Sequence, residues 1–287
     1  MERTSPSELL IRQRLATLMR TLPGALRGDV QSIHQARVAT RRLREALPLA
    51  ASGARGRKLA RTVRKLTRAL GPVRELDVAL INLDELDKDG EIPRSALTRL
   101  RQVIGEERQR LFVEMRRRVE HLDLEKLRKR AIAAAGKGQA TARRPRVARR
   151  AAALRLAIEG AAGIYLPDRL HDVRIAVKKL RYALEVAREL SGSRAMASIR
   201  TLKEAQDLLG RMHDLEILIA RTRAVQGSPL GTNLRLSGDL DRLVRRLENE
   251  CRLLHGHYMA SRHKLLAICE RAEAAAQTGT GTATPAA

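Results

Sequence analysis

The stretch HQARVATRRLREAL, residues 34–47, recurs in the second half of the chain as HDVRIAVKKLRYAL, residues 171–184. Seven of the fourteen positions are identical, and three more exchange Val for Ile or Arg for Lys. The two copies begin 137 residues apart in the numbering. A repeat at this distance predicts two related halves that arose by internal duplication.

Each copy, wound as an α-helix of 3.6 residues per turn, carries a stripe of basic side chains along one face. The stripes consist of His34, Arg37, Arg41 and Arg44 in the first copy and His171, Arg174, Lys178 and Arg181 in the second. Like charges at this spacing repel each other weakly, and neither stripe contains an acid. We therefore expect an anion to lie along both stripes.

A separate face of each copy is mostly apolar and predicts how the helix packs. Its residues are Ala36, Thr40, Leu43 and Leu47 in the first copy and Val173, Val177, Leu180 and Leu184 in the second. Helix signals dominate the remaining sequence, and no segment shows the sustained alternation of a strand. Four helical segments in each half predict an all-α protein of two four-helix bundles.

The expected organisation is two halves joined by a short linker. We place the first half at residues 5–135, the linker at 136–145, the second half at 146–277 and a disordered tail at 278–287. Local signals also predict helix ends. Ser5 and Asp29 are expected to cap the first two helices, which should end at Pro23–Gly24 and near Pro48, and Gly71–Pro72 should break or kink the third.

A second repeated block follows each basic stripe. LGPVRELD, residues 70–77, corresponds to LGRMHDLE, residues 209–216. The carboxylates Glu75 and Asp214 follow a glycine that is expected to break its helix, so we assign them to neutralising a helix end or a stripe arginine rather than to catalysis. Further basic residues precede the block: Arg57, Arg61, Arg64 and Arg68 in the first half, and Arg200 and Lys203 in the second.

The composition limits the class of partner. The 287 residues carry 57 Lys and Arg against 32 Asp and Glu, a formal net charge of +25. This charge favours nucleic acids, anionic membranes or phosphate chains. The chain has one Phe, three Tyr and no Trp, whereas single-stranded nucleic acid is usually held by stacking its bases on aromatic rings. An anion with phosphates and no bases fits this composition better.

The remaining signals describe a protein of a reducing compartment. Cys251 and Cys269 lie in one long helical segment, about 27 Å apart if that helix is continuous, which is too far for a disulfide. No apolar run reaches the length of about 18 residues that a membrane span requires, and the N-terminus lacks a signal-peptide core. We expect a cytoplasmic protein without a bound metal or other cofactor.

His34 and His171 each begin a stripe, and several roles are open to them. A charged imidazole can donate two hydrogen bonds to a phosphate chain, whose charge favours the protonated ring. The alternatives are a structural role, a phosphoacceptor role and metal ligation. A phosphoacceptor would require a nucleotide site, and the sequence has no glycine-rich phosphate loop. A metal site would require companion ligands, which neither histidine has at the third or fourth following position. We favour the phosphate-donor role.

The paired motif resembles the signature of the CHAD family, the conserved histidine α-helical domain. The matching residues are His34, Arg37, Arg41, Arg42 and Arg44, and His171, Arg174, Lys178, Lys179 and Arg181. The resemblance covers nearly the whole chain. It implies two four-helix bundles related by pseudo-twofold symmetry, with the stripe helices lining a basic central channel. It also implies binding of inorganic polyphosphate and association with polyphosphate or storage granules.

These observations lead to one prediction and two alternatives. We predict a non-enzymatic protein that binds inorganic polyphosphate along the two stripes, with the basic residues around Arg57–Arg68 and Arg200–Lys203 contributing. Some members of the CHAD family carry a fused domain that hydrolyses triphosphates, and the resemblance implies no catalysis for this chain. The alternatives are an enzyme that processes phosphate chains or forms phosphohistidine, and a general binder of polyanions, such as nucleic acid, or of granule surfaces through its net charge alone. We expect no binding to a specific nucleic acid.

Overall fold

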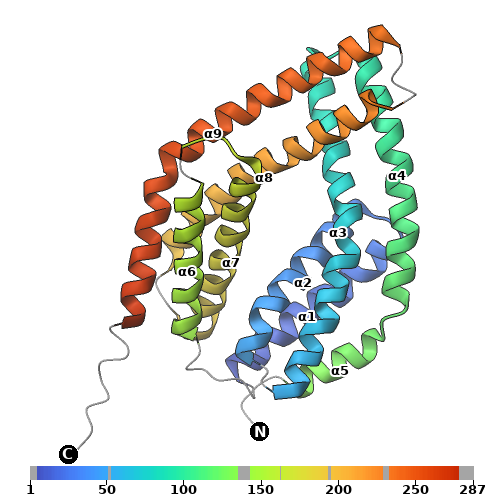
Figure 1. The fold of residues 1–287 in the computed structure, drawn as a ribbon. Coiled ribbons are helices and arrows are strands. Elements are labelled where there is room, and N and C mark those ends of the chain that lie inside the picture. The colour runs from blue at the N-terminus through green and yellow to red at the C-terminus, as the bar shows by residue number, and fades with distance from the viewer. Residues whose placement is uncertain are drawn as a thin grey trace, which may run out of the picture.

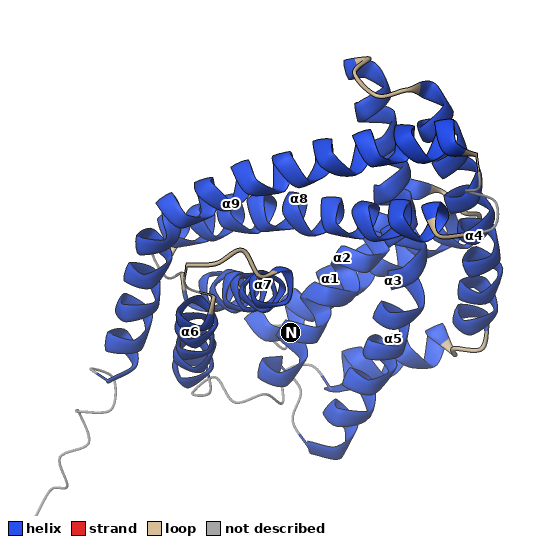
Figure 2. Ribbon diagram, turned by 45° about the horizontal axis from the view of Figure 1, so that its top comes forward, coloured by secondary structure: helices blue, strands red, loops and turns tan. Residues whose placement is uncertain are grey.

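A computed structural model describes residues 5–50, 53–134, 143–161, 163–192, 195–228 and 233–277 (Figures 1 and 2). The secondary structure in these ranges is helical, with short turns and loops between the helices. The helices are α1 (Pro6–Leu26), α2 (Val30–Ala50), α3 (Gly53–Asp89), α4 (Arg94–Glu120), α5 (Leu124–Ala134), α6 (Arg143–Gly160), α7 (Pro167–Ser191), α8 (Met196–Gln226) and α9 (Leu234–Gln277). None of the helices in these ranges is both long enough and apolar enough to cross a membrane.

The first bundle is built around α2. It packs between α1 and α3, while α4 lies along α3, and α5 closes the bundle against α1 and α3. The predicted caps are confirmed. Ser5 Oγ accepts a hydrogen bond from the Glu8 amide at 3.2 Å, and Asp29 Oδ2 accepts one from the Ser32 amide at 2.8 Å. Both caps satisfy amide groups that lack a partner within the helix.

The second bundle contains the repeated stretch in α7. This helix packs between α6 and α8, and α9 contacts both α6 and α8, so the four helices form a closed ring. The apolar face predicted for each copy is buried in both bundles, including Thr40, whose hydroxyl donates to the Arg37 carbonyl at 2.8 Å. Cys251 and Cys269 are buried free thiols.

One apolar cluster spans both bundles where the long helices meet, and a second cluster lies mainly within the first bundle. Leu83 in α3 and Leu97 in α4 are fully buried in the same cluster as Leu215 in α8 and Leu243 in α9. Figure 1 shows the ends of α8 and α9 reaching across to α3 and α4. The core therefore does not separate at the predicted linker. That linker lies mostly outside the described residues, although residues 143–145 begin α6.

Proline and glycine mark the ends of α1 and α2 to within a few residues, but they do not interrupt α3. α1 ends two residues beyond Pro23–Gly24, and α2 ends at Ala50, near Pro48 as predicted, whereas α3 runs without interruption through Gly71–Pro72. Proline removes one main-chain hydrogen bond and costs about 3 kcal/mol in a helix interior. In α3 the flanking side chains of Leu70, Val73 and Leu76 are fully buried, and this packing holds the helix together. The predicted break at Gly71 is wrong.

Candidate anion-binding site

The two stripe helices α2 and α7 face one another across a cleft of about 400 Å³. Helices α3 and α8 form its other walls. The lining residues are His34, Arg37, Val38 and Arg41 from α2, His171, Arg174, Ile175 and Lys178 from α7, Gly71, Arg74, Glu75 and Val78 from α3, and His213, Asp214 and Ile217 from α8. With the exception of Gly71, the positions contributed by one half correspond to those contributed by the other.

The glycine of the repeated block makes room for the first arginine of the stripe. Arg37 Nη1 donates to the Thr67 carbonyl of α3 at 3.1 Å. A Cβ atom added to Gly71 would lie only 2.9 Å from this Nη1. In the second half, a Cβ atom on Gly210 would lie 3.9 Å from Arg174 Nε, an ordinary contact. Gly71 therefore does not break α3. It leaves room for the Arg37 guanidinium to lie against that helix.

The cations of the cleft are crowded and partly buried. Burial, together with the charges of Arg41 and Arg174, lowers the pKa of Arg37 to about 10. Burial and the same kind of repulsion, led by Arg41, lower the pKa of Lys178 to about 7. Among the described residues, neither Arg41 nor Lys178 has a carboxylate oxygen within 4.0 Å. The cleft thus holds positive charge that the protein itself leaves uncompensated, and an anion would relieve the repulsion.

The two carboxylates of the cleft do not cap helices, because both lie inside long helices. Glu75 Oε1 is 3.6 Å from Arg221 Nη2 of α8 and so joins the two halves. Burial raises the pKa of Asp214, against the opposing effect of the Arg174 charge. Asp214 therefore interacts electrostatically with a stripe arginine, as one of the two predicted roles requires, whereas the helix-end role is wrong.

The histidines sit in different surroundings in the two halves. His171 Nδ1 lies 3.3 Å from His213 Nδ1 of α8, and His213 Nδ1 lies 3.8 Å from Glu216 Oε2. In the first half, Arg74 occupies the place of His213 and its charge, after burial, lowers the pKa of His34. Burial and the neighbouring His213 likewise lower the pKa of His171. Both rings therefore favour the neutral form until an anion enters.

Sequence reasoning missed Arg74 and His213 as cleft residues. The available signal was their shared position in the repeated block, three residues after the glycine, where one half has Arg and the other His. Among the described residues, no three His, Cys, Asp or Glu side chains are grouped so as to hold a metal ion.

Comparison with known proteins assigns the fold. The sequence model of the CHAD domain matches residues 9–223. The chain belongs to the CHAD domain family. No curated protein shows significant sequence similarity to it.

Two solved structures have the same fold as this CHAD chain. The crystal structure of the CHAD domain from the plant Ricinus communis is 21% identical, with a TM-score of 0.69, over 91% of this chain and 92% of that chain. PptA from Streptomyces chartreusis is 13% identical, with a TM-score of 0.68, over 89% of this chain and 97% of that chain. Identities this low establish the fold alone.

The CHAD cleft brings together part of the predicted basic set. His34, Arg37, Arg41, His171, Arg174 and Lys178 line it. Arg42, Arg44, Lys179 and Arg200 are exposed outside it, as are Arg57, Arg61, Arg64 and Arg68 on α3, and Lys203 lies 3.5 Å from Asp207.

The last stripe residue differs most between the halves. Arg181 is buried, donates to Gln206 Oε1 at 3.1 Å and forms an ion pair with Glu185. Its counterpart Arg44 is exposed. The basic stripe therefore continues to the surface in the first half, whereas in the second half it ends in a neutralised pair.

Proposed function

We propose that this CHAD protein binds inorganic polyphosphate in the cleft between α2 and α7 and does not process it. The observation that carries the proposal is the convergence of His34, Arg37 and Arg41 with His171, Arg174 and Lys178 around one cavity. Charged hydrogen bonds from guanidinium and ammonium groups to phosphate oxygens are about twice as strong as neutral ones. A phosphate chain would also replace the repulsion among these cations by attraction.

The lining of the cleft favours a phosphate chain over single-stranded nucleic acid. The residues around the cavity include no Phe, Tyr or Trp, and base stacking on such rings contributes about 1–3 kcal/mol per base in single-strand binders. The lining includes His34 and His171, which could in principle accept a phosphoryl group. We propose binding without turnover because the lining is dominated by cations that can hold phosphate oxygens. Cytoplasmic location and granule association stay predictions.

The test removes two cleft cations that have no carboxylate partner. Arg41→Gln with Lys178→Gln should weaken binding of polyphosphate by at least about 100-fold, because charged hydrogen bonds contribute about 1.5–3 kcal/mol each and each 1.4 kcal/mol is a factor of ten in affinity. Thermal stability should stay equal or rise as repulsion is relieved. The matched control is Arg245→Gln with Lys264→Gln, two exposed residues of α9 whose replacement changes the net charge equally.

Titration calorimetry and thermal unfolding measure both effects. Equal affinity in the cleft variant and the control would contradict the proposal. Incubation of the protein with chains of defined length and Mg²⁺ tests the absence of turnover, since shortened chains or phosphohistidine would reveal an enzyme.

A further inference from the structure

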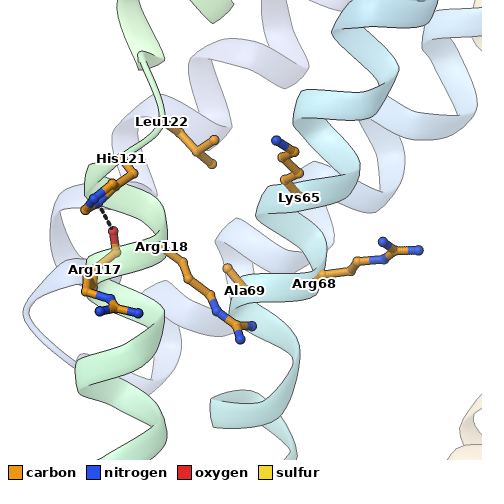
Figure 3. A pocket seen from close by; sticks show the side chains of 7 residues that line it. All are labelled: Lys65, Arg68, Ala69, Arg117, Arg118, His121 and Leu122. Atoms are coloured by element: carbon orange, nitrogen blue, oxygen red, sulfur yellow. Dashed lines mark hydrogen bonds between the residues drawn. The ribbon is translucent and has the colours of Figure 1, made fainter.

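A second basic cavity, of about 600 Å³, lies between α3 and the end of α4. Its lining residues are Lys65, Arg68 and Ala69 of α3, Arg117 and Arg118 of α4, and His121 and Leu122, which follow α4 (Figure 3). We call this cavity the α3/α4 groove. Five of its seven residues are basic or imidazole side chains, and none is a carboxylate. It is larger than the central cleft. Of its lining residues, the sequence predicted only Arg68 to contact phosphate.

The groove keeps most of its charge uncompensated. Figure 3 shows Lys65 and Arg118 extending into the space between the two helices, while Arg68 points away from α4. Arg118 Nη2 lies 2.5 Å from Glu114 Oε1 in a pair one turn apart that is exposed to solvent, and such pairs are weak. Within the described ranges, Lys65 and Arg117 have no carboxylate oxygen within 4.0 Å.

Positive charge also connects the groove to the central cleft. Arg44 is the exposed last residue of the α2 stripe, one turn beyond Arg41. Although Arg44 is exposed, partial desolvation of its guanidinium lowers its pKa, and the nearby charges of Arg64 and Arg68 on α3 lower it further, against the opposing charge of Glu45. Arg68 in turn lines the groove. The basic side chains therefore form a path from the cleft, past Arg44 and Arg68, around α3.

Among the described residues, the second half lacks the exposed stripe end that Arg44 provides in the first. Arg181, the counterpart of Arg44, is buried in its ion pair with Glu185, and Arg42 Nε also lies 3.9 Å from a Glu185 oxygen. A phosphate chain that left the cleft along α7 would therefore meet no free stripe cation at this position.

We propose that a polyphosphate chain held in the cleft continues past Arg44 and Arg68 into the α3/α4 groove, which acts as a second phosphate subsite reached only by long chains. This inference rests on the proposed function of the cleft. A tethered segment binds its second site at an effective concentration in the millimolar range for short flexible connections. Tripolyphosphate should be unable to span both sites, because a helix with its side chains is about 10 Å wide.

The experiment compares short and long ligands on three matched variants. The groove variant is Lys65→Gln with Arg117→Gln, at two exposed positions. The cleft variant is Arg41→Gln with Lys178→Gln, and the control is Arg245→Gln with Lys264→Gln. Each changes the net charge by the same amount, and thermal unfolding verifies that each is folded. Dissociation constants for tripolyphosphate and for long-chain polyphosphate are measured over a range of salt concentrations.

The groove variant should bind tripolyphosphate as the control does and long chains about tenfold more weakly. Its salt slope for long chains should fall by roughly 1.4, or about 0.7 for each lost phosphate contact, by analogy with single-stranded nucleic acid. Unchanged affinity for long chains would overturn the second subsite, and so would an equal loss for both ligands. If the cleft variant binds both ligands as the control does, the proposed function itself fails, whatever the groove variant shows.

Discussion

Gly71 and Gly210 occupy the same place in the repeated block, but only Gly210 has room for a Cβ atom. A Cβ atom at Gly71 meets Arg37 Nη1 at 2.9 Å, whereas at Gly210 the nearest atom of Arg174 is 3.9 Å away. Alanine in place of glycine stabilises a helix interior by about 0.5–1 kcal/mol. Comparing alanine substitutions at the two positions therefore distinguishes the gain in helix stability from the effect of a methyl group on the position of Arg37.

Gly210→Ala should raise the free energy of unfolding by about 0.5–1 kcal/mol and leave polyphosphate affinity unchanged. Gly71→Ala should displace the Arg37 guanidinium from Thr67, weaken binding several-fold and stabilise the protein less than Gly210→Ala. Denaturant unfolding and calorimetry measure both quantities. Wild-type affinity in the Gly71 variant would show that the position of Arg37 against α3 does not matter for binding.

The residue-level predictions from sequence succeeded where helix geometry alone decides the outcome. Both stripes face one cleft because periodicity fixes the face of each helix. The exceptions are Arg44, which is exposed outside the cleft, and Arg181, which pairs with Glu185 four residues later, where the first copy has Pro48. That pairing signal was present in the sequence. The approach of Arg74 and His213 to the cleft depends on how α3 and α8 pack against the stripe helices, which no local pattern specifies.

At the scale of elements, local breaker signals were outweighed by packing. Of the two outcomes predicted at Gly71–Pro72, a break or a kink, the break is wrong: α3 continues for 37 residues because buried leucines and valines flank the pair on both sides. Caps were predicted correctly at Ser5 and Asp29, since a cap depends only on neighbouring residues. Helix ends that depend on contacts with other helices could not be predicted from neighbouring residues.

The stability of the unliganded protein and its affinity for polyphosphate should depend on pH in opposite directions, because of the cations on the stripe helices. Lys178 faces Arg37 and Arg41 of α2 and Arg174 and Lys179 of its own helix, and its pKa in the folded protein is about 7, against about 10.4 in an unfolded chain. Between these values the unfolded chain binds more protons, so stability should rise with pH. We expect a gain of about 1–2 kcal/mol between about pH 6 and 9.

Affinity for polyphosphate should fall over the same range. A bound anion raises the pKa of Lys178 and of the two stripe histidines, so binding takes up protons and weakens as pH rises. Lys178→Met should flatten both trends. Thermal unfolding at several pH values, with calorimetry in buffers of different ionisation enthalpy, measures them. A Lys178→Met protein with the pH profile of the wild type would contradict this explanation.

At the scale of the whole molecule, the shared core predicts a single unfolding transition. Leu97→Ala removes a fully buried side chain from the cluster to which both halves contribute, and should cost about 2–5 kcal/mol. Amide exchange should then accelerate in α8 and α9 as well as in α3 and α4. Destabilisation confined to the first half would show that the halves unfold independently, as their separation in the sequence suggests.

Salt should affect binding strongly, because the net charge is +25 and the cleft neutralises several phosphates at once. By analogy with nucleic acids, raising salt from about 50 to 200 mM should weaken polyphosphate binding by orders of magnitude. Dissociation constants measured across this range provide the test. A nearly constant affinity would indicate a few specific contacts in place of the stripes.

Ion pairs join the two halves on either side of the chain's duplication. Arg211 Nη1 lies 2.8 Å from Glu85 Oε2, Arg221 bonds to Glu107, and Arg14 Nη2 lies 2.9 Å from Glu189 Oε2. With its walls tied in this way, we expect the cleft to change little in width when a ligand binds. A single phosphate chain is much narrower than a base-paired duplex, so a cleft of fixed width should admit the chain more readily. Selection by cross-section requires no closure over the ligand, so phosphate chains should enter at rates set by diffusion and electrostatic steering alone.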